Sequence, residues 1–317
     1  MRRAWLALLV LAACQAPRTT PQTPYLLVLG SAQNGGLPQI GCREPACARA
    51  REDDTFRRRV TSLALVDPRD GRRWLLDASP ELAEQVELLE SVAPRAPRGS
   101  SRPPLFEGIF LTHAHVGHYA GLAQLGREIY GARELPVWCS QRMDAFLRSN
   151  GPWSLLVDTR AIELRGLEPG APVQLAADLS VDSLRVPHRD EFSDTLALVV
   201  RGPSRTVAYL PDIDKWERWD IPLEDFLASV DLALVDGTFF ADGEVPGRAM
   251  AEIPHPFISE TLARLSAAPL ELRRKVVFTH LNHTNPAADP KSAAARAIQA
   301  AGMRVARDGE VLALGAN

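Results

Sequence analysis

Six of the seven histidines in this chain fall in three short clusters. The densest cluster, Leu111 to His118, reads Leu-Thr-His-Ala-His-Val-Gly-His; the other two are Val186 to Asp190 and Phe278 to Thr284. Imidazole is the commonest side-chain ligand for zinc and iron, and three histidines within six residues are easily brought to one point. The spacing therefore predicts a metal site, with two metal ions expected, that acts on water or oxygen.

The first cluster can serve both ions. His113 and His115 point to the same side of an extended segment, because side chains alternate with a period of two, so both can bind one ion. His118, at a helix start, can reach a second ion, and Asp212 is a suitable bridging carboxylate. A capping or core role is the alternative for any single histidine, but it is disfavoured for the whole set. The expected metal ligands are His113, His115 and His188 for the first ion, His118 and His280 for the second, and Asp212 for both.

Strands are expected to position these residues. Short apolar runs bounded by turn residues predict strands, and His113, His188, Asp212, Asp236 and His280 all follow such runs closely. A rigid sheet can aim side chains from several strand ends into one cleft. Strands are predicted at 25–30, 62–66, 74–76, 109–111, 136–139, 179–186, 195–201, 206–210, 232–235, 275–279 and 311–314, and helices at 81–89, 119–130, 259–265 and 292–301.

The N-terminus resembles a lipoprotein signal. Arg2 and Arg3 precede an apolar run at 5–11 that is too short to span a bilayer. Leu11-Ala12-Ala13-Cys14 resembles a bacterial lipobox, so we expect a signal peptide at 1–13, a lipid on Cys14, a tether at 14–24 and a single domain at 25–317. Gln15 stands where an inner-membrane retention aspartate would be, which favours an anchor in the outer membrane facing the periplasm. The net charge of −3 gives no basic patch for nucleic acid.

Several motifs resemble known families. Residues 112–118 resemble the His-x-His-x-Asp-His motif of the metallo-β-lactamase superfamily, and 75–79 resemble its first motif, in which the aspartate is structural. Residues 29–32 with 35–39, then 235–239 and 280–286, resemble the family of pyrroloquinoline-quinone biosynthesis protein B, so the resemblance covers nearly all of the mature chain. It implies an α/β fold, a four-layer αββα sandwich with the metal ions at one edge.

The resemblance also implies a general acid. Related phosphodiesterases, including the tRNA-maturation ribonuclease, carry a catalytic histidine on a loop that follows a Thr-Phe strand end. Asp236 and His255 are similar to that arrangement, with His255 protonating the leaving group and Asp236 orienting it. The alternative is a loop histidine between prolines. His283 is a further catalytic candidate, and it or Asp190 could assist the second metal site.

Two departures from these families matter. Gly117 stands where the superfamily has an aspartate ligand, so the second site is expected to be weaker or differently selective. Glu44 replaces the middle cysteine of the relatives' Cys-x-Cys-x-x-Cys run, which argues against a structural zinc site there. In an oxidising periplasm, a Cys42–Cys47 disulfide is the expectation instead. Trp216 and Trp219 could line a substrate cleft, although helix packing is favoured.

Three functional hypotheses follow. The first is a metal-dependent hydrolase that holds one or two zinc ions, with iron or manganese as alternatives, and attacks a phosphoester or related ester through a metal-bound hydroxide. The second is an iron-dependent oxidase or hydroxylase related to pyrroloquinoline-quinone biosynthesis. The third is a lipoprotein that binds a metal or another ligand without catalysis.

Overall fold

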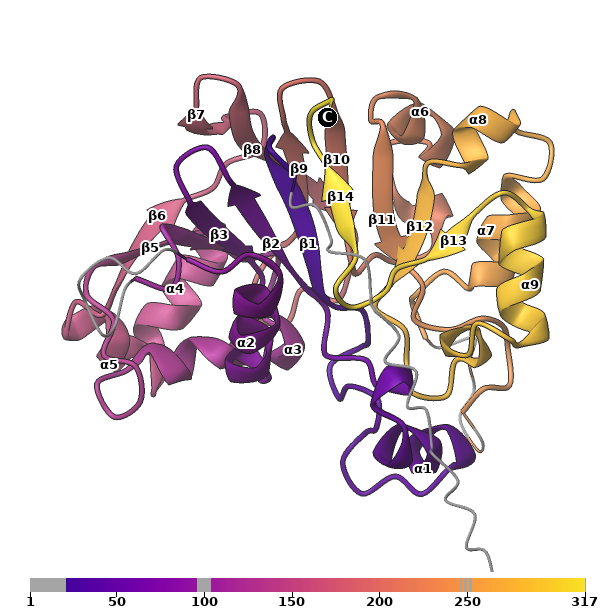
Figure 1. Ribbon diagram of the computed structural model, residues 1–317, viewed down its shortest axis with the longest axis horizontal. Helices are drawn as coiled ribbons and strands as arrows, with labels where there is room; N and C mark the ends of the chain where they lie inside the picture. Colours follow the sequence, from indigo (N-terminus) through magenta and orange to yellow (C-terminus); the bar gives the residue numbers. More distant parts are fainter. Residues whose placement is uncertain (1–20, 96–103, 246, 248–249, 251–252, 317) are drawn as a thin grey trace, which may run out of the picture.

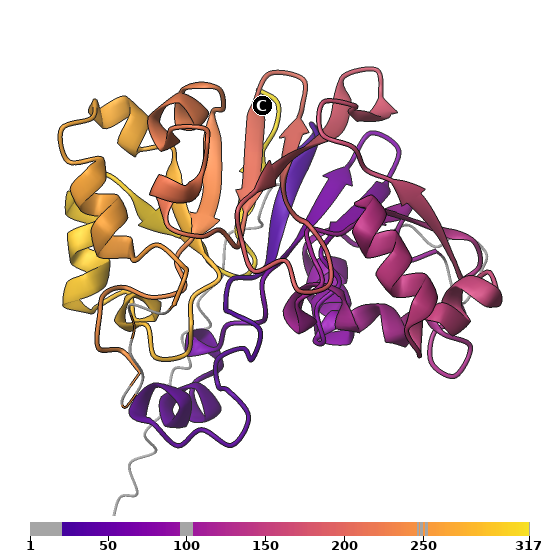
Figure 2. The ribbon, with the colours of Figure 1, turned by 180° about the vertical axis from the view of Figure 1, so that it is seen from behind.

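The structure, a computed structural model, describes residues 21–95, 104–245, 247, 250 and 253–316, and the proposed signal peptide and Cys14 lie outside these residues. Two β-sheets lie in the middle of the molecule, and helices cover the outer face of each (Figure 1). Figure 2 shows the same layers from behind. The predicted four-layer αββα sandwich is confirmed.

The first sheet has seven strands in the order β14-β1-β2-β3-β4-β5-β6. Neighbours from β14 to β3 pair antiparallel, and neighbours from β3 to β6 pair parallel. The strands are β1 (Tyr25–Gly30), β2 (Ser62–Asp67), β3 (Arg72–Leu76), β4 (Gly108–Phe110), β5 (Leu135–Cys139), β6 (Ile162–Gly166) and β14 (Val311–Ala313).

The second sheet repeats this plan in the order β13-β12-β11-β10-β9-β8-β7. Neighbours from β7 to β10 pair antiparallel, and neighbours from β10 to β13 pair parallel. The strands are β7 (Val173–Ala176), β8 (Leu179–Val186), β9 (Thr195–Arg201), β10 (Thr206–Leu210), β11 (Leu232–Asp236), β12 (Val276–Thr279) and β13 (Arg304–Val305).

Both faces of the central strands are buried, which explains their continuous apolar sequences. In β1, Leu26 and Val28 belong to the core between the two sheets. Tyr25, Leu27 and Leu29 alternate with them and pack in the core under the helices of the first sheet. The sheets are therefore held rigidly from both sides, and their ends are fixed supports for side chains.

Helices α2 to α5 cover the first sheet, and α6 to α9 cover the second, while α1 lies in the long connection between β1 and β2 (Figure 1). Among the described residues, no helix has the length and apolarity needed to cross a bilayer. The helices are α1 (Pro45–Glu52), α2 (Leu82–Val92), α3 (Val116–Tyr119), α4 (Gln141–Ser149), α5 (Trp153–Asp158), α6 (Leu223–Ala228), α7 (Ile258–Arg264), α8 (Leu270–Arg273) and α9 (Ala293–Ala300).

The single helix predicted at 119–130 is wrong. The chain forms the one-turn α3 and then a 3-10 helix, Ala120–Leu125. Gly121 packs directly on the loop after β3, where its backbone N–H donates to the Ala78 carbonyl and an added Cβ would lie 2.0 Å from the Ser79 carbonyl oxygen. This close backbone approach requires glycine and replaces regular helical geometry. The packing interpretation of Trp216 and Trp219 is correct, since both lie in the core of the second sheet.

Candidate metal centre

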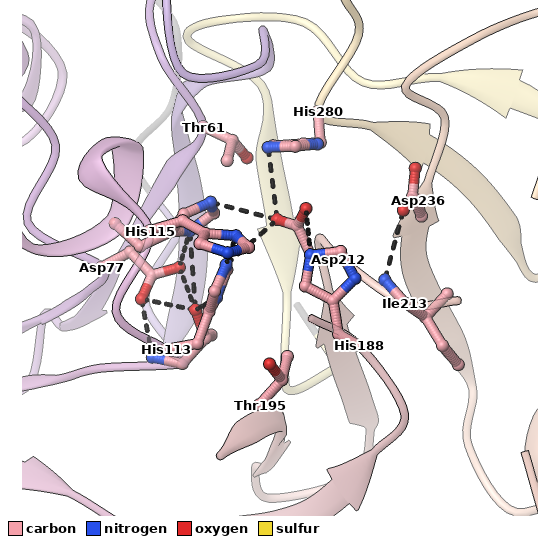
Figure 3. A network of polar contacts seen from close by, with 12 residues as sticks. Thr61, Asp77, His113, His115, His188, Thr195, Asp212, Ile213, Asp236 and His280 are labelled. Atoms are coloured by element: carbon pink, nitrogen blue, oxygen red, sulfur yellow. Dashed lines mark hydrogen bonds and ion pairs between the residues drawn. The ribbon is translucent and has the colours of Figure 1, made fainter. Parts of the chain in front are cut away.

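The histidine clusters meet at one edge of the sandwich. The parallel strands β3 and β4 of one sheet and β10, β11 and β12 of the other end there, and the loops that follow them carry the polar side chains. The carboxyl ends of parallel strands share an edge, so their loops form one site. Figure 3 shows these side chains converging on Asp212 from both sheets.

The four residues predicted to bind the first metal ion are brought together. His113, His115, His188 and Asp212 each place one ligand atom within 4.8 Å of the others. His113 Nε2 lies 2.8 Å from His115 Nδ1, and His188 Nε2 lies 3.5 Å from Asp212 Oδ1. These atoms are on buried or half-buried side chains at the ends of β4, β8 and β10.

The second predicted group is equally compact. His118, Asp212 and His280 form a buried set whose ligand atoms also lie within 4.8 Å of one another. Asp212 Oδ2 is 3.0 Å from His118 Nε2 and 3.2 Å from His280 Nε2. His280 has a φ of +60°, a left-handed conformation that is uncommon for residues other than glycine, and its ring faces Asp212 (Figure 3). Asp212 thus belongs to both groups, as expected of a bridging carboxylate.

Two similar hydrogen-bond relays fix the tautomers of His113 and His280. The Thr112 hydroxyl donates to Asp77, so it accepts from His113 Nδ1 at 2.9 Å. On the opposite sheet, the Thr238 hydroxyl donates to Asp236 and accepts from His280 Nδ1, also at 2.9 Å. Each relay makes the Nε2 atom of its histidine the ring's acceptor, which is the atom that a metal ion binds. His280 Nε2 lies 3.2 Å from Asp212 Oδ2, and His113 Nε2 lies 3.9 Å from it.

Further carboxylates orient the other rings. His118 Nδ1 donates to Asp77 Oδ2 at 2.7 Å. His115 Nε2 lies 3.1 Å from Glu191 Oε2, and His188 Nδ1 lies 3.3 Å from Asp214 Oδ1. The sequence motifs had singled out Asp77 as structural but missed the roles of Thr112, Thr238, Asp214 and Glu191. Each of the four lies within three residues of a predicted ligand or of Asp236, which was the only available signal.

The buried polar atoms that lack partners identify the place for a cation. His118 Nε2, His188 Nε2, His280 Nε2 and Asp212 Oδ2 are all buried without a hydrogen-bond partner among the described residues. A buried polar atom without a partner carries a large desolvation cost, which a bound metal ion removes. Nitrogen and carboxylate donors in this number suit zinc or another divalent transition metal. The residues present therefore fit the expected metal ions.

The charges of the centre agree with this assignment. Burial holds the pKa of His113 well below its ordinary value and lowers that of His280 to about 4, so both rings are neutral ligands. Burial opposes the charged form of His118, but Asp77 and Asp212 outweigh it and raise its pKa to about 10. Burial also opposes ionisation of Asp212, yet the surrounding histidines, led by His280, hold its pKa well below the usual range. A metal ion bound at His118 Nε2 would take the place of the proton that the raised pKa otherwise keeps on this ring.

The predicted pair of His255 and Asp236 lies directly beside the centre. His255 Nδ1 donates to Asp236 Oδ2 at 2.6 Å and lies 3.9 Å from Asp212 Oδ1. Asp236 is held by the backbone N–H of Ile213 and by both the N–H and the hydroxyl of Thr238. Burial disfavours charge on His255, but the Asp236 carboxylate prevails and raises its pKa. The ring is therefore fixed in place, with Nε2 as its remaining polar atom.

His283 is not part of this centre. It lies with Cys42 and Cys47, and the three ligand atoms are within 4.8 Å of one another. The expected Cys42–Cys47 disulfide is wrong for this structure, because both cysteines are free. Burial and the neighbouring Cys42 thiol raise the pKa of Cys47, whose sulfur accepts from the Gln39 backbone N–H at 3.4 Å. Asp190, the other suggested helper, accepts from the Thr195 hydroxyl at 3.1 Å.

A cavity of about 700 Å³ opens next to the centre. His255 forms part of its wall, so the Asp236–His255 pair connects the cavity to the metal ligands. The positively charged Arg189 also lines the cavity, as do the side-chain amides of Asn34 and Asn282. A concave site with a few converging polar groups is the usual form of a substrate site.

Comparisons with known proteins agree with the fold and the site. Residues 72–310 match the family described as Beta-lactamase superfamily domain. Coenzyme PQQ synthesis protein B from Methylobacterium nodulans is 33% identical over 314 residues, which cover 91% of this chain and 99% of that protein. The chain belongs to the β-lactamase superfamily and, within it, to the family of coenzyme PQQ synthesis protein B.

Two solved structures share the fold. Zn(2+)-bound PqqB from Methylobacterium extorquens superposes with a TM-score of 0.75 at 23% identity, covering 91% of this chain and 99% of that one. A diphosphatase from the PhnP family superposes with a TM-score of 0.62 at 20% identity, covering 91% and 96%. The histidine and aspartate groups of this chain suit a divalent metal ion such as zinc.

Proposed function

We propose that this chain is a metal-dependent hydrolase that cleaves a phosphoester or a related ester. The observation that carries the proposal is the His255–Asp236 pair, which lies beside Asp212 at the wall of the cavity. A histidine that is oriented by a carboxylate and adjoins a two-metal ligand set is well placed to protonate a leaving oxygen.

The roles of the chain's own residues follow from their contacts. His113, His115 and His188 would hold one metal ion and His118 and His280 the other, with Asp212 shared between them. When bound, the metal ions supply Lewis-acid polarisation of the substrate and activation of water. Asp236 keeps His255 Nδ1 engaged, which leaves Nε2 to deliver a proton to the leaving group.

Arg189 favours an anionic substrate. It lies on the same cavity wall as His255, and its guanidinium is half exposed with Glu191 at 3.6 Å. A planar guanidinium suits the paired oxygens of a phosphate group. Because Glu44 also lines the cavity, a substrate with a single negative charge, such as a phosphodiester, fits better than a dianion.

The test is turnover by protein of measured metal content. We expect hydrolysis of bis(p-nitrophenyl) phosphate in preference to p-nitrophenyl phosphate and p-nitrophenyl acetate. His255→Ala is expected to lower kcat about 10²- to 10⁴-fold without loss of metal. Arg189→Ala is expected to raise KM, whereas Arg127→Ala, a distant exposed arginine, serves as its matched control. Metal-loaded protein that turns over none of the three esters would refute the proposal.

A second candidate function rests on the family. The relative from Methylobacterium nodulans is named for coenzyme PQQ synthesis and matches 91% of this chain. The same ligand groups could hold iron for an oxidase or hydroxylase step in that synthesis. Iron in the purified protein, together with oxygen consumption in the presence of a PQQ precursor, would favour this function. A colourless zinc protein that consumes no oxygen would count against it.

The cellular location is a separate proposal. We infer that Cys14 carries a lipid that anchors the protein in the outer membrane, with the domain facing the periplasm, and the support is the signal-peptide pattern alone. Labelling with radioactive palmitate in a Gram-negative host tests this. Label on wild type and its absence from Cys14→Ala are expected, and an unlabelled wild type would contradict the proposal.

A further inference from the structure

The carboxylate that the superfamily motif supplies at position 117 is missing, but its space is not empty. A Cβ added to Gly117 would lie 2.0 Å from Asn34 Oδ1 and 2.9 Å from Asn34 Cγ. These distances are too short for real atoms, so the Asn34 amide occupies the volume in which an aspartate side chain at 117 would begin. With Asn34 in this conformation, position 117 has no room for a Cβ, so the two residues are matched to each other.

The loop that carries Asn34 is fastened to the second group of metal ligands. On one side, Asn34 contacts Gly117, the residue before His118. On the other side, the Gln33 N–H donates to the Leu281 carbonyl at 2.8 Å, and Leu281 follows His280 directly. The segment of Gln33 and Asn34 is thus held between the chain neighbours of the two histidines in the second group.

The side-chain oxygen of Asn34 has no hydrogen-bond donor among the described residues. This Oδ1 atom is buried, although the residue itself reaches the cavity. The Nε2 atoms of His118 and His280 share this condition, as does Asp212 Oδ2. A buried carbonyl oxygen left without a donor is costly unless a cation or water binds it.

We propose that the side-chain oxygen of Asn34 replaces the missing carboxylate and serves as an oxygen ligand of the metal ion held by His118 and His280. Amide oxygens bind divalent ions but carry no charge, so this ligand is weaker than a carboxylate. The second site therefore binds its ion more weakly than the first, and a carboxylate at position 34 would strengthen it. The inference rests on the metal centre of the proposed function and is independent of the substrate.

The experiment is a cobalt titration of metal-free protein, followed by visible absorption and by equilibrium dialysis with measured metal content per chain. A Cys42→Ser background keeps the Cys42, Cys47 and His283 group from adding a further cobalt site. Wild type is expected to bind two Co²⁺ ions in this centre, one tightly and one weakly. Asn34→Ala is expected to weaken the second ion at least about tenfold and leave the first unchanged. Asn34→Asp has the same shape and is expected to tighten the second ion at least about tenfold.

The outcomes separate this inference from the others. Asn150→Ala, at an exposed asparagine after α4, is the matched control and should leave both affinities unchanged. An Asn34→Ala variant that binds the second ion like wild type, or a wild type that binds only one ion at any concentration, would overturn the proposal. An unchanged first affinity in each variant shows that the fold is intact. Failure to hydrolyse phosphodiesters, with the expected titrations, would refute the hydrolase proposal alone.

Discussion

Replacing Asp77 by alanine is expected to destabilise the metal-free protein severely. Asp77 is fully buried at the end of β3 and has a φ of +64°. Its carboxylate accepts from the backbone N–H and hydroxyl of Thr112, from His118 Nδ1 and from the hydroxyl of Tyr209 on β10. One side chain therefore joins the loop after β4, helix α3 and a strand of the opposite sheet.

The magnitude follows from the donors that alanine leaves unpaired. Each buried donor without an acceptor costs about 1–3 kcal/mol, and breaking a buried ion pair costs about 3–5 kcal/mol. Two effects reduce this loss of stability. The desolvation cost of burying the Asp77 charge is no longer incurred, and the Tyr209 hydroxyl still has the Thr61 hydroxyl at 3.3 Å as a partner. We expect a loss of roughly 4 kcal/mol for Asp77→Ala. Asp77→Asn tolerates the left-handed backbone and keeps one acceptor, so we expect about half that loss.

Urea unfolding of chelator-treated protein, followed by the fluorescence of the six tryptophans, measures these values. The metal-free state separates the hydrogen bonds of Asp77 from any effect of metal affinity. Asp158→Ala, at the exposed end of α5, is the control and should change the free energy of unfolding by less than about 0.5 kcal/mol. An Asp77→Ala variant within 1 kcal/mol of wild type would refute the reasoning.

Three further predictions concern stability. Gly108→Ala places a Cβ 2.1 Å from Trp138 Cζ3 and is expected to lower the free energy of unfolding, measured in urea, by about 1–3 kcal/mol. A variant as stable as wild type would show that the Trp138 ring moves aside freely. Burial raises the pKa of Asp308 to about 6, above its ordinary 3.8, so the folded chain binds this proton more tightly. The free energy of unfolding is therefore expected to fall by roughly 3 kcal/mol as the pH rises from about 4 through 6. Asp308→Asn should remove this pH dependence, and profiles of unfolding free energy against pH that run parallel for the two proteins would contradict the prediction. Chelation of metal from the holoprotein is expected to lower Tm by about 10 °C in a thermal melt, since a tightly bound ion contributes about 4 kcal/mol; an unchanged Tm would show that the ligands hold no ion.

Local sequence patterns anticipated most of the framework. The strands at 179–186, 195–201 and 206–210 match the structure to the residue, because continuous apolar runs between turn residues are recognisable without knowledge of their partners. Helix α4 and strand β6 went unrecognised because they are mostly polar: α4 buries only Met143 and Leu147, and β6 buries only Ile162. The one-turn α3 could not be foreseen, since its early end depends on the distant carbonyl of Ser79.

The sequence by itself predicted which histidines and aspartates meet at this edge of the sheets, and it predicted the pair of His255 and Asp236. Spacing and residue chemistry are local properties, and the ends of parallel strands have a predictable meeting place. Only the tertiary structure decided which atoms surround them. It placed His283 with two free cysteines, although His283 is only three residues from His280. It also placed Asn34 in the space beside Gly117, a contact between residues far apart in the chain that no local pattern encodes.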